Sequence, residues 1–560
     1  MQRDFDKTDL KHELRQIVRG EVLDDPETRK IYSRDASLFE VWPTVVVWPK
    51  DKEDVKSVVR FVSKKKKEDK ENGSEKYKNL SVTVRAAGSC MSGGSLNESI
   101  ILDVSKYLNK FSVDAPNRLA EVEPGVFYRD FEVETLKHDL ILPCYTASKN
   151  LCALGGMIGN NAAGEKTLSH GKMENFIEEL TVILKDGEEY ILRPISRVDL
   201  LRRSHEHDFG GGVYERMMRL IEENRDTINK AKPKVSKNSA GYYLWNIERN
   251  GMFDLSKLLV GSQGTLGIMV GAKIRLEEVR PKSKLLVIFL PSTEKLGDLV
   301  NTILPHNPES LESYDDSTFK LAVRYLPEML KIMKTGFLKL VWSFLPEAWM
   351  ALTSGIPKLV LLVEFAGKEE SEIDQKIEKL KKDLKRFGLS MRSTKKVEEV
   401  EKYWTIRRES FNLLRKHIHG KRTAPFIDDV CVEPKNLPKF LPRLKKILDD
   451  ARLLYTIAGH AGNGNFHVIP LMDMKDSHNR ALIPLLSEKI YDLVKEYGGT
   501  ITAEHNDGIV RTPYLNKMYS PEILDLFKQT KQIFDPENIF NPGKKVGGTV
   551  EYMVGHLAKD

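Results

Sequence analysis

The stretch RAAGSCMSGGS, residues 85–95, is the first of three glycine-rich segments on which the fold prediction for this 560-residue chain rests. It follows an expected strand at residues 82–85. Its small residues let backbone N–H groups approach an anion closely, and its serines add hydroxyl donors. The segment is therefore suited to bind a diphosphate. The pattern is neither Gly-x-Gly-x-x-Gly nor Gly-x4-Gly-Lys-Ser/Thr, so it predicts neither a Rossmann loop nor a P-loop. Taken alone the signal is weak, because many surface turns contain Gly and Ser.

Two further glycine-rich segments lie downstream. LGGMIGNNAAG, residues 154–164, is nearly free of bulky polar side chains and suits a flat ring pressed against backbone. The alternative for this loop is a close helix–strand contact that needs small residues. GSQGTLGI, residues 261–268, precedes another strand. Three such loops in one region predict an extended ligand of phosphates and rings.

Strands alternate with helices on both sides of these loops. Residues 1–40 indicate helix and loop. A helix is expected at residues 51–67, where valines recur at helical spacing. After Pro281 the composition changes, and Ser292 is expected to cap the first helix there. Strands are expected at residues 45–48, 82–85, 100–103, 285–290, 359–365 and 388–393, and further helices at residues 369–386 and 396–417.

This order predicts an α+β fold in which the later strands form a sheet covered by helices on one face. The expected organisation is a helical segment at 1–40, a ligand-binding domain at 41–280, a second domain at 281–500 and a C-terminal segment at 501–560. Within that last segment, the aromatic and proline-rich residues 533–543 are expected to pack back on the first domain.

Two histidines flank a glycine-broken turn in HAGNGNFH, residues 460–467. Glycines disfavour a helix there, so the pattern predicts a strand, a tight turn and a second strand. With Glu504, the imidazoles of His460 and His467 are enough to hold a divalent metal and leave a position open for substrate. His505 then lies beside a ligand, where a proton acceptor is useful. The alternative is that these are ordinary loop histidines.

Composition limits the class of protein. The chain is 41% hydrophobic with a net charge of +7, so it can bury sizeable cores. The basic stretch around residues 64–78 is interpreted as a solvated surface loop and not as a nucleic-acid patch, because only Tyr77 interleaves its lysines. The four cysteines include no Cys-x-x-Cys pair, which argues against a disulfide framework, a cysteine zinc site or an iron–sulfur cluster on this chain.

A reducing cytoplasm fits the cysteine usage, and no signal peptide is visible at the polar N-terminus. No stretch is long enough for a spanning helix. Residues 337–352, which contain Trp342 and Trp349, are interpreted as packed helices. The alternative is an interfacial patch that places the protein peripherally on the inner face of the membrane.

Together these motifs resemble the FAD-linked oxidase family, the superfamily of vanillyl-alcohol oxidase and p-cresol methylhydroxylase (PCMH). The closer resemblance is to its branch of D-lactate dehydrogenases, D-2-hydroxyglutarate dehydrogenases and the FAD subunit of glycolate oxidase. It covers nearly the whole chain, from YSRDA at residues 32–36 to NPGK at residues 541–544. It implies a two-subdomain, PCMH-type FAD-binding domain and an α+β substrate (cap) domain with an antiparallel sheet.

The resemblance implies that the three glycine-rich segments and Ser148 hold FAD. In members with covalent flavin a histidine often occupies the position matching Ser89, so non-covalent FAD is implied. The implied cofactor-binding residues are Arg85, Ala86, Ala87, Gly88, Ser89, Cys90, Ser92, Gly93, Gly94, Ser148, Gly155, Gly156, Gly159, Asn160, Asn161, Gly164, Gly264, Gly267 and Ile268.

For catalysis, His460, His467 and Glu504 match the family's metal ligands, and His505 matches its proposed base. Arg407 matches an arginine assigned to the substrate carboxylate, for which a guanidinium fork is suited. The alternatives are that Arg407 is a surface charge or that Arg408 is the inward residue. Zinc is the default metal for two histidines and one glutamate, with manganese or iron as alternatives.

Several positions depart from the family pattern: Asn463 and Asn506 stand where Asp and Gly are usual, and Gln263 where Glu is typical. These departures remove none of the proposed metal ligands or the proposed base, so they affect the identity of the substrate more than the type of reaction. The implied function is oxidation of a D-2-hydroxy acid, with D-lactate and D-2-hydroxyglutarate favoured over glycolate, and electrons passing to a quinone, cytochrome or separate iron–sulfur protein. The rivals are a sugar-oxidising or non-redox flavoenzyme such as an alkylglycerone-phosphate synthase, a flavin-free metal hydrolase, and a non-catalytic FAD subunit.

Overall fold

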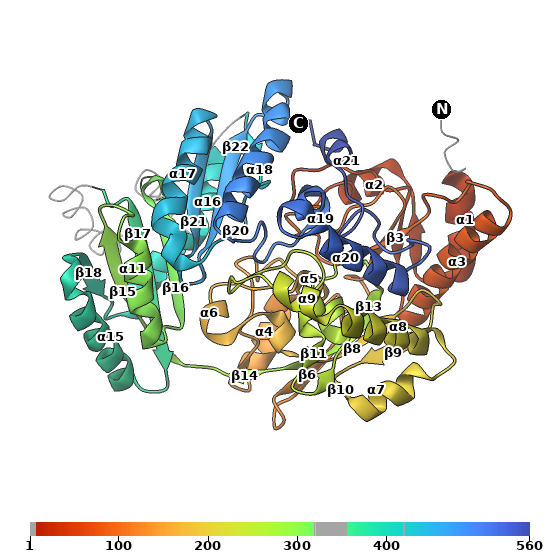
Figure 1. Cartoon of the computed structure of the whole chain (residues 1–560), viewed down its shortest axis with the longest axis horizontal. Helices are drawn as coiled ribbons and strands as arrows, with labels where there is room; N and C mark the ends of the chain where they lie inside the picture. The colour runs from red at the N-terminus through yellow and green to blue at the C-terminus, as the bar shows by residue number, and fades with distance from the viewer. Residues whose placement is uncertain (1–6, 319, 321–355, 418–419, 560) are drawn as a thin grey trace.

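The computed structural model describes residues 7–318, 320, 356–417 and 420–559 (Figure 1). A small sheet lies at the N-terminal end of the molecule, in the order β1 (Glu21–Leu23), β2 (Val45–Trp48), β4 (Ile100–Asp103), β3 (Val82–Arg85). β4 pairs in parallel with both β2 and β3. Helices α1 (Lys7–Ile17) and α3 (Lys52–Glu71) share a core with this sheet, since the predicted valine stripe of α3 is buried against it.

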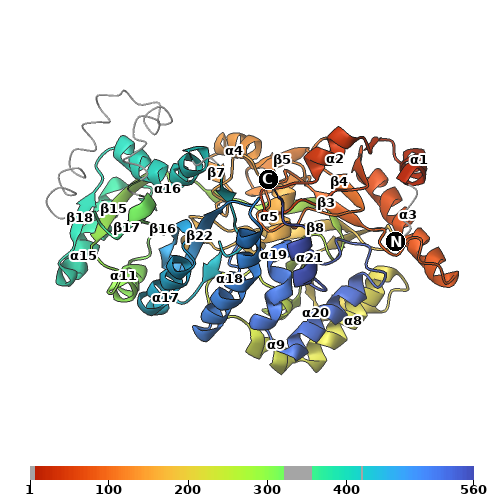
Figure 2. The ribbon, with the colours of Figure 1, turned by 90° about the horizontal axis from the view of Figure 1, so that it is seen from above.

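A second, antiparallel sheet completes the first half of the chain. Its order is β5 (Phe111–Asp114), β6 (Leu119–Val122), β13 (Ile268–Arg275), β8 (Ile177–Ile183), β9 (Glu189–Leu192). Its core takes in residues of α8 (Phe209–Glu223) and of the C-terminal helix α20 (Pro521–Phe534), which pack on each other (Figure 2). The other elements here are α2 (Pro26–Tyr32), α4 (Tyr128–Leu136), α5 (Leu154–Asn160), α6 (Thr167–His170), α7 (Arg197–Ser204), α9 (Arg225–Ala231), α10 (Ser256–Leu259), and the two-residue strands β7 (Leu140–Ile141), β10 (Ile195–Ser196), β11 (Glu248–Arg249), β12 (Met252–Phe253) and β14 (Glu277–Glu278).

The second half builds one large antiparallel sheet at the other end of the molecule (Figure 1). In the part of the chain that the structure describes, its order is β18 (Ser390–Ser393), β15 (Lys282–Leu290), β17 (Leu359–Gly367), β16 (Ser310–Asp315), β21 (Leu454–His460), β22 (Asn465–Met472), β19 (Arg422–Thr423), with β20 (Val430–Cys431) also pairing with β22. The proposed domain boundary near residue 281 falls at the start of β15.

Helices cover this large sheet on both faces, where the sequence led us to expect one. α11 (Leu296–Ile303), α15 (Glu370–Leu384), α17 (Leu437–Asp450) and α18 (Ser477–Glu496) share one core with it. On the opposite face, residues of α16 (Val397–His417) pack against β15 and β17. The reason is that β15 is apolar on both sides: Leu286 and Ile288 face one core, and Leu285 and Val287 face the other.

Four local expectations differ from the structure. Residues 20–40 contain the strand β1, which pairs with β2. The first part of the basic stretch, residues 64–71, is helical and not a loop, because α3 continues to Glu71. Residues 154–160 form the short helix α5, whose apolar side chains are buried, and Asn161 ends it in a left-handed conformation. Ser292 does not cap α11, which begins at Leu296 after Lys295.

The C-terminal segment returns to the first half of the chain, as expected. The backbone N–H of Val82 in β3 donates to the Ile539 carbonyl at 2.8 Å, and the Asn541 N–H donates to the Val82 carbonyl at 3.0 Å. Ile539 and Phe540 are fully buried in the core of the small sheet. Residues 337–352 lie outside the described residues, and none of the described helices is both long and apolar enough to cross a bilayer.

Candidate active site

The hairpin β21–β22 carries both histidines of the predicted metal site. His460 ends β21 and pairs with Asn465, and His467 pairs with Ala458. The turn between them is closed by Gly464 at φ 70°, where an added Cβ would lie 1.8 Å from the Val432 carbonyl oxygen, so a side chain is excluded there. The predicted strand, tight turn and strand are confirmed.

Glu504 lies between these imidazoles, although 37 residues separate it from His467. Its Oε1 is 3.2 Å from His460 Nε2 and 3.3 Å from His467 Nε2. The hairpin and the segment carrying Glu504 therefore bring the three predicted metal ligands together, with both imidazoles facing one oxygen of Glu504.

The outer nitrogens of both imidazoles are engaged elsewhere. His460 Nδ1 is 2.6 Å from Glu312 Oε1 on β16, and His467 Nδ1 is 3.0 Å from the Asp428 carbonyl oxygen. Since both acceptors require an N–H at Nδ1, the lone pairs lie on Nε2 and point at the Glu504 carboxylate. With Nδ1 occupied on both rings, each Nε2 is available as a metal ligand beside the Glu504 carboxylate, so this donor set of two imidazoles and one carboxylate fits a divalent metal.

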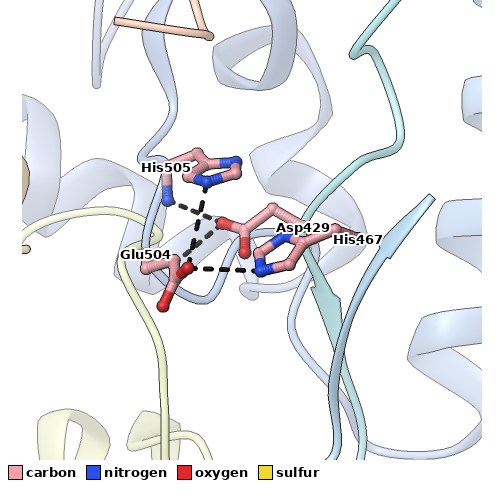
Figure 3. A group of neighbouring side chains, drawn as sticks. All are labelled: Asp429, His467, Glu504 and His505. Carbon is pink, nitrogen blue, oxygen red and sulfur yellow. Dashed lines mark hydrogen bonds and ion pairs between the residues drawn. The ribbon is translucent and has the colours of Figure 1, made fainter. Parts of the chain in front are cut away.

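Asp429 is a rival ligand, because its carboxylate lies within 4.8 Å of ligand atoms of His467, Glu504 and His505 (Figure 3). Its oxygens, however, are already committed. Oδ2 accepts the backbone N–H groups of Ala503, Glu504 and His505 at 2.8, 2.8 and 2.7 Å, and Oδ1 accepts the Asn465 amide at 3.1 Å. Asp429 therefore shapes the backbone that presents Glu504, and His460 remains the better third ligand.

His505 is held by a buried acid. Its Nδ1 is 2.8 Å from Asp428 Oδ2, and the other oxygen of Asp428 accepts from the buried Arg511. The ring of His505 stacks on that of His467, with centroids 5.0 Å apart. Burial alone would lower the pKa of His505, but Asp428 and then Asp429 outweigh it and raise the pKa to about 9. The remaining nitrogen, Nε2, is 3.9 Å from Glu504 Oε1.

The two arginines of α16 have different partners. Arg407 Nη2 is 3.3 Å from Glu312 Oε2, and its Nε is buried without a hydrogen-bond partner among the described residues. Arg408 is held by Glu165 through two nitrogens, and its guanidinium lies 4.6 Å from the ring centroid of Trp404. Arg407 thus has a buried donor, Nε, without a partner among the described residues, whereas Glu165 already occupies Nε and Nη2 of Arg408, which favours Arg407 as a carboxylate ligand.

One cavity of about 660 Å³ is lined by the glycine-rich segments, by both arginines and by the histidine site. Gly156 and Gly159 border it, and a Cβ added at either would meet no atom within 4 Å, so the absence of side chains there keeps the cavity open for a flat ring. Thirteen of the predicted cofactor residues line it: Ala86, Ala87, Gly88, Ser89, Cys90, Gly94, Ser148, Gly155, Gly156, Gly159, Asn160, Gly264 and Gly267.

The other six predicted cofactor residues lie outside the cavity lining: Arg85, Ser92, Gly93, Asn161, Gly164 and Ile268. Arg85 stacks on Tyr32 at 5.0 Å, and Ile268 is buried in the core under β13. At Gly93 a Cβ would lie 2.8 Å from the Phe39 ring, so this glycine allows close packing. These residues pack beneath the glycine-rich segments and do not line the cavity.

The sequence did not single out several residues that complete the site. Glu312, Asp428, Asp429 and Arg511 orient the histidines and the Glu504 backbone, and Lys237 contacts Glu504 itself. The acidic pair 428–429, between the apolar residues Ile427 and Val430, was the available signal, because two adjacent carboxylates among buried apolar residues need partners.

Two family models match the chain. Residues 43–193 match an FAD binding domain, and residues 280–545 match the C-terminal domain of FAD linked oxidases. The chain therefore carries an FAD binding domain followed by a C-terminal domain of the FAD-linked oxidase type. This supports FAD as the cofactor for which the cavity is shaped.

The chain is similar to several known proteins. It is 29% identical over 536 residues to D-2-hydroxyglutarate dehydrogenase of Pseudomonas putida, covering 94% of this chain and 50% of that protein. It is 26% identical over 506 residues to D-lactate dehydrogenase of Archaeoglobus fulgidus, covering 90% and 91%. It spans about half the length of the D-2-hydroxyglutarate dehydrogenases it matches. The solved structure of p-cresol methylhydroxylase with substrate bound superposes with a TM-score of 0.68 at 14% identity, covering 97% of each chain. The predicted PCMH-type, α+β fold is thus confirmed.

Proposed function

We propose that this protein is an FAD-dependent dehydrogenase that oxidises a D-2-hydroxy acid to the 2-oxo acid with the help of a divalent metal. The observation that carries the proposal is the single cavity into which the glycine-rich segments, Arg407 and the histidine site all open. D-Lactate and D-2-hydroxyglutarate are the favoured substrates, in line with the relatives of those names. Glycolate is the alternative.

Bound non-covalently along the glycine-rich segments, FAD would supply the acceptor for the two electrons and the hydrogen that leave the substrate Cα. His460, His467 and Glu504 would hold the metal, zinc by default, and it would supply a Lewis acid that lowers the pKa of the substrate hydroxyl.

The residues of the chain then have distinct tasks. Arg407 binds the substrate carboxylate with the donors that Glu312 leaves free. His505 accepts the hydroxyl proton at Nε2, because Asp428 keeps its Nδ1 protonated and so fixes the tautomer. A positive charge among the ligands opposes the raised pKa of His505, which favours the neutral form that a base requires.

The electrons must leave the reduced flavin for an external acceptor. A quinone, a cytochrome or a separate iron–sulfur protein is proposed, because the sequence carries no cysteine motif for a cluster of its own. A cytoplasmic location is proposed because the few cysteines fit a reducing compartment, and peripheral contact with the membrane is proposed because it would give access to a quinone.

Anaerobic flavin reduction tests the proposal. The FAD-loaded protein is mixed with D- and L-lactate, D- and L-2-hydroxyglutarate and glycolate, with and without a chelator. We expect bleaching of the flavin bands by a D-acid, with the rate lost in chelator and restored by Zn²⁺ or Mn²⁺. Bleaching by no 2-hydroxy acid would favour a non-catalytic FAD subunit, and a protein that takes up no FAD would favour the metal hydrolase.

A further inference from the structure

Lys237 lies at the buried end of the histidine site. Its side chain is 0% exposed, and its Nζ is 2.7 Å from Glu504 Oε2. The remaining neighbours of the ammonium are weaker: the Gly164 carbonyl at 3.4 Å and Asn465 Oδ1 at 3.5 Å. The carboxylate of Glu504 is therefore the main partner of a fully buried cation.

The segment that follows Lys237 is hydrogen-bonded to the segment that carries Glu504. Ser239 donates its N–H to the Thr502 carbonyl at 2.9 Å and its hydroxyl to the Ala503 carbonyl at 2.7 Å. Asn238 accepts the Thr500 hydroxyl at 2.7 Å. Because the residues directly after Lys237 are held by these bonds, the backbone keeps the ammonium beside Glu504.

The two oxygens of Glu504 are thereby given different surroundings. Oε2 faces the ammonium, and Oε1 faces the Nε2 atoms of His460 and His467. Burial alone would raise the pKa of Glu504, but Lys237 and then His460 outweigh it, and the pKa lies well below its ordinary value. An isolated buried carboxylate costs several kcal/mol, so a fixed counter-charge decides whether the group stays in place.

Resting on the proposed metal site, we propose that Lys237 is an internal counter-cation that holds Glu504 in its ligating position before metal binds. The ammonium replaces part of the positive charge that the metal would otherwise provide in the metal-free protein. The same positive charge repels the incoming metal ion. Lys237 therefore keeps Glu504 in position but lowers the affinity of the site for the metal. Lys237 is a positioning residue, because it acts through Glu504.

Lys237→Met tests this on the FAD-loaded 560-residue chain, stripped of metal with EDTA and then titrated with Zn²⁺ alone. We expect the Tm of the metal-free variant to fall by several degrees more than the Tm of the zinc-loaded variant. Zinc affinity, measured by competition with a zinc-chelating dye, is expected to rise at least tenfold, because the unneutralised Glu504 attracts the metal more strongly.

Lys531→Met is the matched control. Lys531 is also buried and is 2.5 Å from a carboxylate, that of Asp535, but it contacts none of the three proposed ligands. Its Tm loss is expected to be the same with and without zinc. Lys237→Gln keeps a hydrogen-bond donor without the charge and is expected to behave like Lys237→Met.

The outcomes separate the two proposals. Equal Tm losses of Lys237→Met with and without zinc, at unchanged zinc affinity, would show an ordinary structural ion pair and overturn the inference. If Lys237→Met folds in neither condition, Lys237→Gln decides by the same comparison. A variant that folds only with zinc supports the inference. A wild-type protein that binds no zinc or other divalent ion would instead remove the proposed metal site.

Discussion

At the scale of single residues, the site is a line of ionisable side chains in contact with one another. Arg407 contacts Glu312, Glu312 contacts His460, and His460 faces Glu504, which ends on Lys237. Each side chain contacts the next, so the carboxylate of Glu312 holds both Arg407, the proposed ligand of the substrate carboxylate, and His460, a proposed metal ligand. A second line, from Arg511 through Asp428 to His505, holds the proposed base.

His505→Asn should abolish the proton transfer without disturbing the cofactor. Asparagine keeps a polar side chain of similar reach but has no basic nitrogen, so the rate of flavin reduction by substrate is expected to fall about 10²- to 10⁴-fold. Stopped-flow absorbance measures this rate. His478→Asn, at an exposed position on α18, serves as the control and is expected to leave the rate unchanged. An undiminished rate in His505→Asn would mean that another group takes the proton.

Arg407→Met should act mainly on substrate binding. Hydrogen bonds to charged groups contribute about 1.5–3 kcal/mol, which corresponds to a rise in KM of roughly 10- to 100-fold. Arg408→Met removes a guanidinium that is already committed to Glu165, so its larger effect is expected on Tm. Steady-state kinetics on both variants decide the assignment, and a KM that rises more for Arg408→Met would exchange the two roles.

At the scale of elements, the sequence was most informative where a pattern repeats. The valines of α3 and the apolar strand β15 were predicted from their spacing, and the histidine hairpin from Gly462 and Gly464. Residues 154–160 were misjudged because three glycines disfavour a helix on intrinsic grounds, whereas burial of Leu154, Met157 and Ile158 outweighs that cost here.

The supporting residues of the site could not be predicted in the same way. Lys237 and Asp428 meet Glu504 and His505 only through the tertiary fold, across 267 and 77 residues of sequence. No local pattern marks a lysine that will be fully buried, since lysine is ordinarily exposed. Composition and spacing show which residues have useful chemistry, but the partners of these residues depend on the packing of distant strands.

A charged cluster joins α6 to the large sheet. Glu309, next to the start of β16, is 2.9 Å from His170 Nε2 and also contacts Arg280. Burial would raise the pKa of Glu309, but His170, Lys166 and Arg280 outweigh it and lower the pKa to about 2. Because the folded pKa lies below the ordinary 4.5, the stabilisation is fully present above pH 4.5 and is lost as the pH falls toward 2.

Glu309→Gln is therefore expected to reduce the free energy of unfolding by about 3 kcal/mol at neutral pH, and by progressively less in acid. Urea unfolding of wild type and variant at pH 7 and pH 3 measures the gap. Glu278→Gln, which breaks an exposed pair with Lys368, provides the comparison and should give a much smaller gap. A gap that is constant with pH would rule out the ionic origin.

At the scale of the whole molecule, the C-terminal segment fastens the cofactor loops to one another. Asn541 donates its amide to the Gly94 carbonyl at 2.8 Å and to the Gln263 carbonyl at 2.7 Å, and it accepts the Thr83 hydroxyl at 2.8 Å. Gly94 and Gln263 lie in two different glycine-rich segments that line the cavity. One buried side chain thus fixes the separation of two loops on which the proposed FAD site depends.

Asn541→Leu keeps the volume of the side chain but removes these hydrogen bonds. The buried carbonyls then lose their partners at about 1–3 kcal/mol each, so the FAD dissociation constant is expected to rise at least about tenfold. Flavin fluorescence on titration with FAD measures the constant. Asn109→Leu, at an exposed position bonded only to nearby carbonyls, is the control. Unchanged FAD affinity in Asn541→Leu would show that the loops hold their shape without the tail.

The contact between β3 and residues 539–541 also governs when the protein can load its flavin during synthesis. The first glycine-rich segment emerges from the ribosome about 450 residues before the side chain that anchors it, given the 447-residue separation of Gly94 and Asn541. A nascent chain halted before that point has an unfilled gap beside β3, where Ile539 and Phe540 belong. We therefore expect FAD to bind tightly only after residues 539–541 have been synthesised, and a chain stalled or cleaved before them to bind FAD weakly.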